Sequence, residues 1–187
     1  MSANSKHPLR TWILSLAGLL LGAALAPVPS SLAQEAGLDE IKYAEDYERL
    51  QAIAAVKSPT DRAQRIAALY RDRPDMDSRL VAYADGLFTE NLDALLKQGN
   101  SIAVRGLSER ALGARPKFGE IYLYLGVALK NEGKIEEAMK AFAKCHLIQN
   151  RFQKRAKTQL DIAYRARNKG SLIGQEKILE AAQKELN

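Results

Sequence analysis

The stretch Gly119–Phe152 constrains the fold more than any other part of the chain. Its sequence, GEIYLYLGVALKNEGKIEEAMKAFAKCHLIQNRF, has two apolar runs at helical spacing, separated by a break at Asn131–Lys134. Gly133 in that break can adopt the positive φ of a tight turn. Gly126 and Ala138 are small where two helices must approach closely, because a bulky side chain there would push the helices apart. The stretch therefore predicts two closely packed helices joined by one turn.

The order of small and large residues in this stretch resembles the tetratricopeptide repeat. That family has the pattern W-x2-L-G-x2-Y, then A-x3-F, then P, over about 34 residues. Tyr122, Leu129 and Asn150 differ from the residue that is usual at their places, and the other four positions agree. The seven positions are Tyr122, Leu125, Gly126, Leu129, Ala138, Phe142 and Asn150, at the Trp, Leu, Gly, Tyr, Ala, Phe and Pro places of the family.

Residues 85–118 repeat the pattern of residues 119–152 about one period of 34 residues earlier. Phe88, Leu95 and Gly99 fall on the places of Tyr122, Leu129 and Gly133, and Pro116 supplies the closing Pro. The earlier copy departs from the family at Asn91-Leu92, Val104 and Ser108, so we expect its helices to pack at a different distance. A weaker third copy, out of register, is predicted at about residues 41–74.

Helix signals continue on both sides of these copies. Ser58 as N-cap, Pro59 in the first turn and Asp61 near the helix dipole predict a helix start. After residue 152 the sequence predicts one more helix to about Arg167. It also predicts a last helix that is capped by Ser171 and has Leu172 and Ile173 on its inward face. This last pair lacks A-x3-F and is predicted to cap the array. The predicted fold class is all-α, and the resemblance implies an α-α superhelix, a TPR-like solenoid over residues 41–187.

The first 33 residues have the features of a secretory signal peptide. Lys6 and Arg10 precede the uncharged apolar run Trp12–Ala26, and small residues up to Ala33 suit a cleavage site. The run is shorter than the roughly 20 residues of a membrane helix. We expect cleavage near Ala33, no transmembrane span afterwards, and a periplasmic or secreted protein. An uncleaved anchor is the alternative. Residues 34–40 are predicted to form a flexible leader, with helix starting near Glu40.

Composition after the leader argues against several chemistries. Loss of Lys6 and Arg10 lowers the formal net charge from +6 to +4, which gives no reason to expect nucleic acid as partner. Cys145 and His146 then remain as the single Cys and the single His. On a helix these neighbours point roughly 100° apart, so their side chains do not converge on one site. A zinc site needs about four ligands, and the chain after the leader has no other Cys or His to supply them. The sequence predicts no metal, no cofactor and no catalytic residue.

Two surfaces are candidates for a protein or peptide partner. The resemblance implies that the first helix of each pair lines a concave groove, although Leu123 and Val127 could equally contact a neighbouring helix. The groove residues so predicted are Thr89, Asp93, Leu123, Val127, Lys130, Lys157, Asp161 and Tyr164. A basic patch, which is either a solvated cap or a docking surface for an acidic partner, consists of Arg151, Lys154, Arg155, Lys157, Arg165, Arg167 and Lys169.

These features lead to three functional hypotheses. The first is an exported, non-enzymatic adaptor that holds a protein or peptide partner in its groove. The second is a self-associating scaffold of the cell envelope, whose basic end meets an acidic helix of a second copy. The third is an enzyme with a site that the sequence does not reveal.

Overall fold

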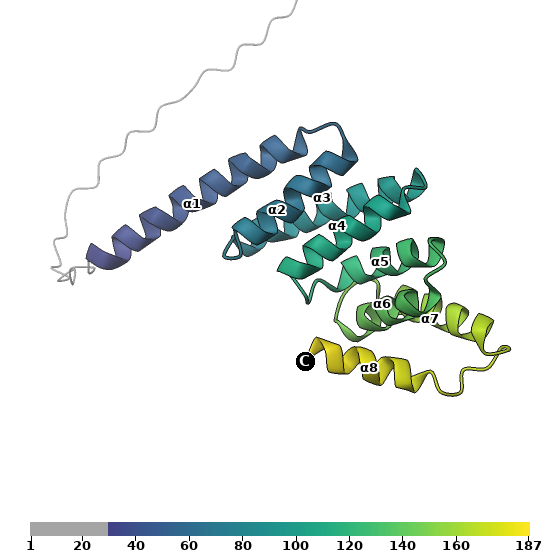
Figure 1. The fold of residues 1–187 in the computed structure, drawn as a ribbon. Coiled ribbons are helices and arrows are strands. Elements are labelled where there is room, and N and C mark those ends of the chain that lie inside the picture. The colour runs from purple at the N-terminus through teal and green to yellow at the C-terminus, as the bar shows by residue number, and fades with distance from the viewer. Residues whose placement is uncertain (1–29) are drawn as a thin grey trace, which may run out of the picture.

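The computed structural model describes residues 30–187 (Figure 1). Most of the predicted signal peptide, including Trp12–Ala26, lies outside the described residues. The described part is all-helical, without strands. Its helices are α1 (Ser30–Ala54), α2 (Pro59–Asp72), α3 (Ser78–Lys97), α4 (Ser101–Ala114), α5 (Gly119–Asn131), α6 (Ile135–Leu147), α7 (Gln153–Arg167) and α8 (Glu176–Leu186).

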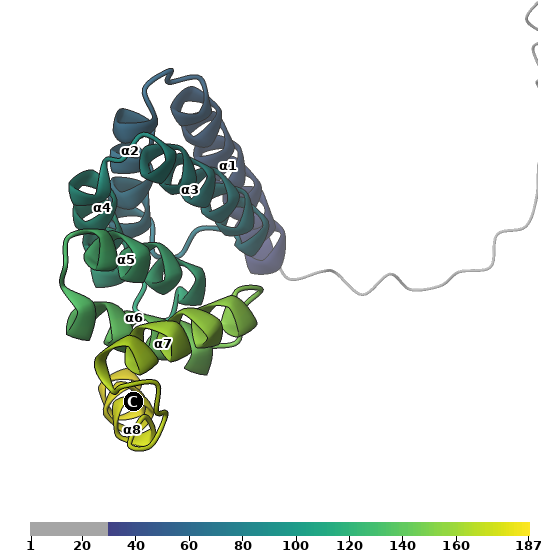
Figure 2. The same ribbon diagram turned by 90° about the vertical axis from the view of Figure 1, so that its right-hand side faces the viewer.

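The helices stack in two layers. Helices α1, α3, α5 and α7 follow one another along one layer, and α2, α4, α6 and α8 along the other (Figures 1 and 2). The most extensive contact is between α5 and α6, which come from the stretch 119–152, whereas α3 and α4 pack less extensively on each other. The two pairs therefore differ in how extensively their helices contact each other, while the predicted difference in packing distance stays a prediction.

Local signals in the sequence place several helix ends correctly. Ser58 precedes α2, and its Oγ accepts a hydrogen bond from the backbone N–H of Asp61 at 3.3 Å. The Asp77 carboxylate caps α3 in the same way, through the Arg79 N–H at 2.8 Å. Gly133 has a φ of +78° in the α5–α6 turn, as predicted.

The first helix differs from its prediction. It begins at Ser30 rather than near Glu40, so residues 34–40, predicted as a flexible leader, are helical. Gln34, Glu35 and Ala36 are good helix formers, and Gly37 is the one unfavourable residue in this polar segment. The prediction relied on apolar periodicity, which a helix end projecting from the body does not need (Figure 1).

The last helix also differs from its prediction. Helix α8 begins at Glu176, and Ser171 instead accepts a hydrogen bond from the Ile173 N–H at 3.1 Å within the preceding loop. Ile173, predicted to point inward, is 90% exposed. Helix α8 packs mainly against α6 rather than against α7, so the α7–α8 pair is not a repeat hairpin.

Candidate partner-binding face

Side chains from three segments meet on the face formed by α3, α5 and α7. The Arg151 guanidinium, in the α6–α7 connection, donates to the Thr89 hydroxyl of α3 at 3.3 Å. It also forms an ion pair with the Glu120 carboxylate of α5 at 3.0 Å. Arg151 therefore ties together elements that are distant in sequence, while more than half of its side chain stays exposed.

An aromatic pair lies beside Arg151. The rings of Tyr124 and Phe152 are edge-to-face, with centroids 6.0 Å apart. Arg151 lies 4.8 Å from the Phe152 ring centroid and Arg155 lies 5.9 Å from it, both within cation–π range. Burial raises the pKa of Tyr124, and the nearby Asp93 adds to the rise. We call Tyr124, Arg151, Phe152 and Arg155 the cation–aromatic strip.

A depression of about 400 Å³ adjoins the strip where α3, the start of α5 and the α6–α7 connection meet. Arg115 on its wall is held by its ion pair with Asp85 and lies 4.6 Å from the Phe118 ring centroid. The Tyr70 hydroxyl donates to the same Asp85 carboxylate at 2.7 Å. Burial, and then Asp85, raise the pKa of Tyr70 far above its ordinary value. Lys117 on the rim is exposed and forms no ion pair with the side chains of residues 39–187.

Three of the predicted groove residues do not line an open groove. Leu123 is only 1% exposed and belongs to the core between α5, α6 and α7. Thr89 is 2% exposed, and its hydroxyl donates to backbone carbonyls of its own helix. Tyr164 is buried, with its hydroxyl bonded to the Ile173 carbonyl at 2.8 Å. Val127 is half-buried against the same core as Leu123. The alternative of contact with neighbouring helices is therefore the correct one for Leu123.

The charged groove residues are more accessible, but each has a partner within the chain. Asp93 pairs with Lys97 at 2.5 Å. Lys130 donates to Gln159 of α7 at 3.3 Å. The Lys157 ammonium contacts the Asp161 carboxylate at 2.5 Å and the Gln175 side chain at 3.0 Å. Lys130 thus connects α5 to α7, and Lys157 connects α7 to the loop before α8, whereas the Asp93–Lys97 and Lys157–Asp161 pairs each lie within one helix.

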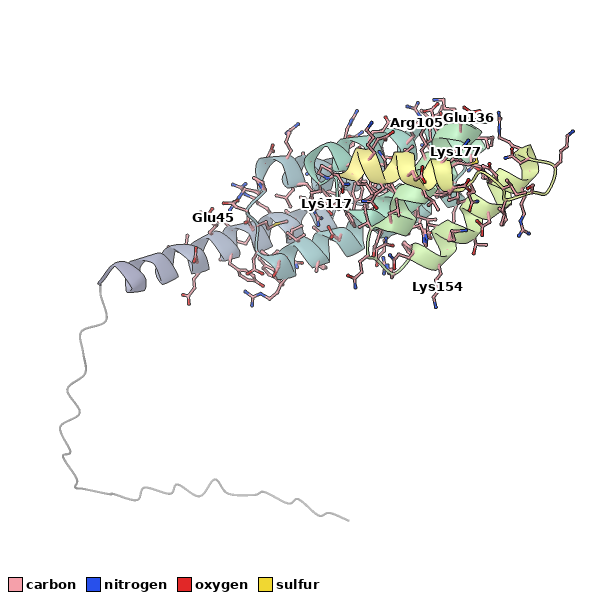
Figure 3. All side chains as sticks on the ribbon, turned by 90° about the horizontal axis from the view of Figure 1, so that it is seen from below. Glu45, Arg105, Lys117, Glu136, Lys154 and Lys177 are labelled. Carbon is pink, nitrogen blue, oxygen red and sulfur yellow. The ribbon has the colours of Figure 1, made fainter. Side chains whose placement is uncertain are left out.

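The predicted basic patch divides into paired and unpaired cations. Arg151, Lys157 and Arg167 form ion pairs, the last with Glu136 of α6 at 2.8 Å. Lys154 projects from α7 on the side opposite Arg105 and Glu136 (Figure 3). The exposed cations of the patch for which the described chain offers no ion pair are Lys154, Arg155, Arg165 and Lys169.

Sequence reasoning did not identify the aromatic half of the strip. Tyr124 is next to the predicted groove residue Leu123, and Phe152 is the last residue of the stretch 119–152. Both aromatic residues were therefore explained by helix packing and were not considered as binding residues. The Arg151-Phe152 pair at the start of a helix, followed by Arg155 one turn later, was the available signal. Periodicity alone could not show that Tyr124 on α5 would lie against Phe152.

The adjacent Cys145 and His146 do not form a reactive pair. The Cys145 side chain is buried, and burial raises the pKa of its thiol to about 12. Within the described residues, no three His, Cys, Asp or Glu side chains are grouped so that they could hold a metal ion.

Among the described helices, none has both the length and the apolar character needed to cross a membrane. Comparison with family models, with curated proteins and with solved structures found no match to this chain.

Proposed function

We propose that this protein is an exported, non-catalytic adaptor of the tetratricopeptide-like kind. It binds an acidic segment of a protein partner on the α3–α5–α7 face. The observation that carries the proposal is the cation–aromatic strip, where Arg151 and Arg155 flank a half-buried Phe152 supported by Tyr124. Arginine and aromatic residues are the side chains most enriched where protein partners bind tightly.

The charges on this face favour an acidic partner. Arg155 and Lys117 form no ion pair in the described chain, and Arg151 shares its guanidinium with a single carboxylate, that of Glu120. Asp93, the acidic residue close to Tyr124, is paired with Lys97. A partner carboxylate would thus meet available guanidinium groups, which hold carboxylates in short, charge-assisted hydrogen bonds. An apolar side chain beside that carboxylate would cover the exposed part of Phe152.

The burial and the raised pKa of the Cys145 thiol support the non-catalytic part of the proposal. A nucleophilic cysteine needs an accessible thiolate, whereas the Cys145 thiol is buried and its pKa is about 12. Export is supported by the features of residues 1–33 alone: two basic residues, the apolar run Trp12–Ala26 and small residues before Ala33.

The test is site-specific photo-crosslinking in intact cells, with the crosslinking residue placed at Lys117, on the rim of the depression beside the strip, or at Arg110 on α4 as control. Partners captured only from Lys117 are then purified and titrated against the protein. We expect Arg151→Glu with Arg155→Glu to weaken binding roughly tenfold or more, through repulsion of partner carboxylates. The matched reversal Arg65→Glu with Arg110→Glu, on α2 and α4, should leave affinity unchanged. Equal affinity of both double variants would disprove the assignment of this face.

A further inference from the structure

The outer face of α1 is acidic and partly apolar. Ile41, Ala44 and Glu48 share the side of the helix opposite the buried Asp46 and Leu50, because they follow i, i+3, i+7 spacing. Ile41 is 60% exposed and is the large aliphatic side chain of this face. Glu40, Glu45 and Glu48 are exposed carboxylates of this part of α1 that form no ion pair with another described side chain. The exposed Arg49 lies one turn after Glu45, so carboxylates outnumber cations on this face but are not alone on it.

The outer face of α7 has the opposite charge. Lys154, Thr158, Ile162 and Arg165 follow helical spacing on the side opposite the buried Ala156 and Leu160. Ile162, in the middle of this row, is 50% exposed. Lys154 and Arg165 form no ion pair in the part of the chain that the structure describes, and neither does Lys169 in the turn after α7. The row is therefore a basic surface around one apolar side chain.

The two faces lie at opposite ends of the same layer. Helix α1 is the first and α7 the last helix of the layer that also contains α3 and α5 (Figures 1 and 2). Because α8 packs mainly on α6, it leaves the outer row of α7 exposed. In stacked helical arrays each unit buries its apolar surface against a neighbour, and an end without a neighbour needs a polar cap. Ile41 and Ile162 interrupt the polar character of these two ends.

We propose that the protein associates head to tail, with the outer face of α1 of one copy against the outer face of α7 of the next. Glu45 and Glu48 then oppose Lys154 and Arg165, and Ile41 and Ile162 are covered. The interface is heterologous, because each copy contributes a different end, so addition can continue from copy to copy. This association uses Lys154 and Arg165 rather than the cation–aromatic strip, and it goes beyond the adaptor role.

The test is sedimentation velocity on protein that is expressed from the full chain. The protein concentration and the salt concentration are both varied. Variant one carries Glu45→Lys and Glu48→Lys, and variant two carries Lys154→Glu and Arg165→Glu. We expect the unchanged protein to associate as its concentration rises, and less so at high salt because exposed charges are screened. Each variant alone should show an apparent dissociation constant roughly tenfold higher or more, since like charges then meet at the interface.

The decisive measurement is the mixture of the two variants. Lysines on α1 of variant one then meet glutamates on α7 of variant two, and the unreversed ends also match, so association should return. A matched control, Lys177→Glu with Lys184→Glu on α8, should associate like the unchanged protein. Arg151→Glu with Arg155→Glu should do so too, which separates this proposal from the adaptor role.

Two results would overturn the proposal. One is an unchanged protein that stays monomeric at all concentrations and salt levels; the other is a mixture of the two variants that sediments as the separate variants do. Circular dichroism on each variant verifies that helix content is retained. If a charge variant loses helix content, Ile162→Ser replaces it, because a half-exposed isoleucine can be made polar without opening the core. Undiminished association of Ile162→Ser would then count against the proposal.

Discussion

A methyl group on Gly126 would lie 2.4 Å from Cε1 of Phe142, which means that the α5 backbone rests directly on this ring. Gly126→Ala should therefore destabilise the protein by about 1–3 kcal/mol, because overpacking a well-packed core forces the helices apart. Denaturant unfolding followed by circular dichroism measures the difference. Phe142→Leu in the Gly126→Ala background should recover part of the loss, since the smaller side chain leaves room for the methyl group.

Gly106 is the matched control for this substitution. It also lies within a helix, α4, but a Cβ there would meet no heavy atom within 4 Å. Gly106→Ala should raise the free energy of unfolding by about 0.4–1 kcal/mol, because alanine has less conformational freedom to lose on folding. Equal effects of Gly106→Ala and Gly126→Ala would show that the contact with Phe142 does not limit the packing of α5 on α6.

A buried ion pair fixes the start of the stack. The Arg73 guanidinium lies 2.6 Å from the Asp46 carboxylate, whose side chain is only 2% exposed. Arg73→Met should destabilise the protein by about 3 kcal/mol, because it leaves a buried carboxylate without a partner. Arg71→Met removes an arginine that is 73% exposed and should change stability by less than about 0.5 kcal/mol. Full stability of Arg73→Met would mean that solvent reaches Asp46.

The sequence predicted those parts of the fold that depend on local rules. The Ser58 cap and the turn at Gly133 follow from residues close together in the chain, and these signals needed no knowledge of tertiary packing. The close approach of two helices at Gly126 was also predicted, but the sequence did not identify the Phe142 ring as the group that the α5 backbone contacts. The all-α class was therefore predictable, while the resemblance to tetratricopeptide repeats remains a prediction about the superhelix.

The parts that were not predictable depend on which helices become neighbours. Ile173 has the right spacing for a helix face, but α8 packs on α6, which leaves Ile173 in an exposed loop. Leu123 looked free because its own helix pair does not need it, yet it is buried in the core that α5 and α6 share with α7. The strip itself exists because Phe152 lies against Tyr124, a contact between α5 and the start of α7 that periodicity does not specify.

Cys145 should be unreactive toward thiol reagents in the folded protein. With a pKa of about 12, only about one thiol in ten thousand is ionised at pH 8, whereas an ordinary cysteine has a pKa near 8.5. Labelling with a chromogenic disulfide should therefore be slow in buffer and fast in denaturant. Rapid labelling without denaturant would show that the α5–α7 core opens readily.

The contact between α6 and α8 should weaken in acid. Lys144 of α6 lies 2.7 Å from Glu185 of α8, and this hydrogen bond and charge lower the pKa of the Glu185 carboxyl in the folded state. The unfolded chain then binds the proton more readily, so the stabilising contribution is present above the ordinary glutamate pKa of about 4.3. It disappears as the pH falls through the lowered pKa of the folded state.

Thermal unfolding of the unchanged protein and of Glu185→Gln between pH 7 and pH 3 measures this effect. The unchanged protein should have the higher Tm at pH 7, and the two values should converge in acid. Glu180→Gln, on an exposed carboxylate of the same helix that forms no ion pair in the described chain, serves as control and should leave the Tm unchanged at every pH. A difference between Glu185→Gln and the unchanged protein that persists at pH 3 would contradict the assigned role of the carboxylate charge.

Loss of the leader should remove tryptophan fluorescence from the protein. Trp12 is the only tryptophan of the chain, and it lies in the apolar run before the predicted cleavage site near Ala33. Protein recovered after export should therefore show tyrosine emission alone, since all seven tyrosines lie after that site. Protein made without the export machinery retains Trp12 and is the positive control. Tryptophan emission from the exported protein would mean that the leader stays attached, as the anchor alternative requires, and mass spectrometry of the intact chain would locate the actual N-terminus.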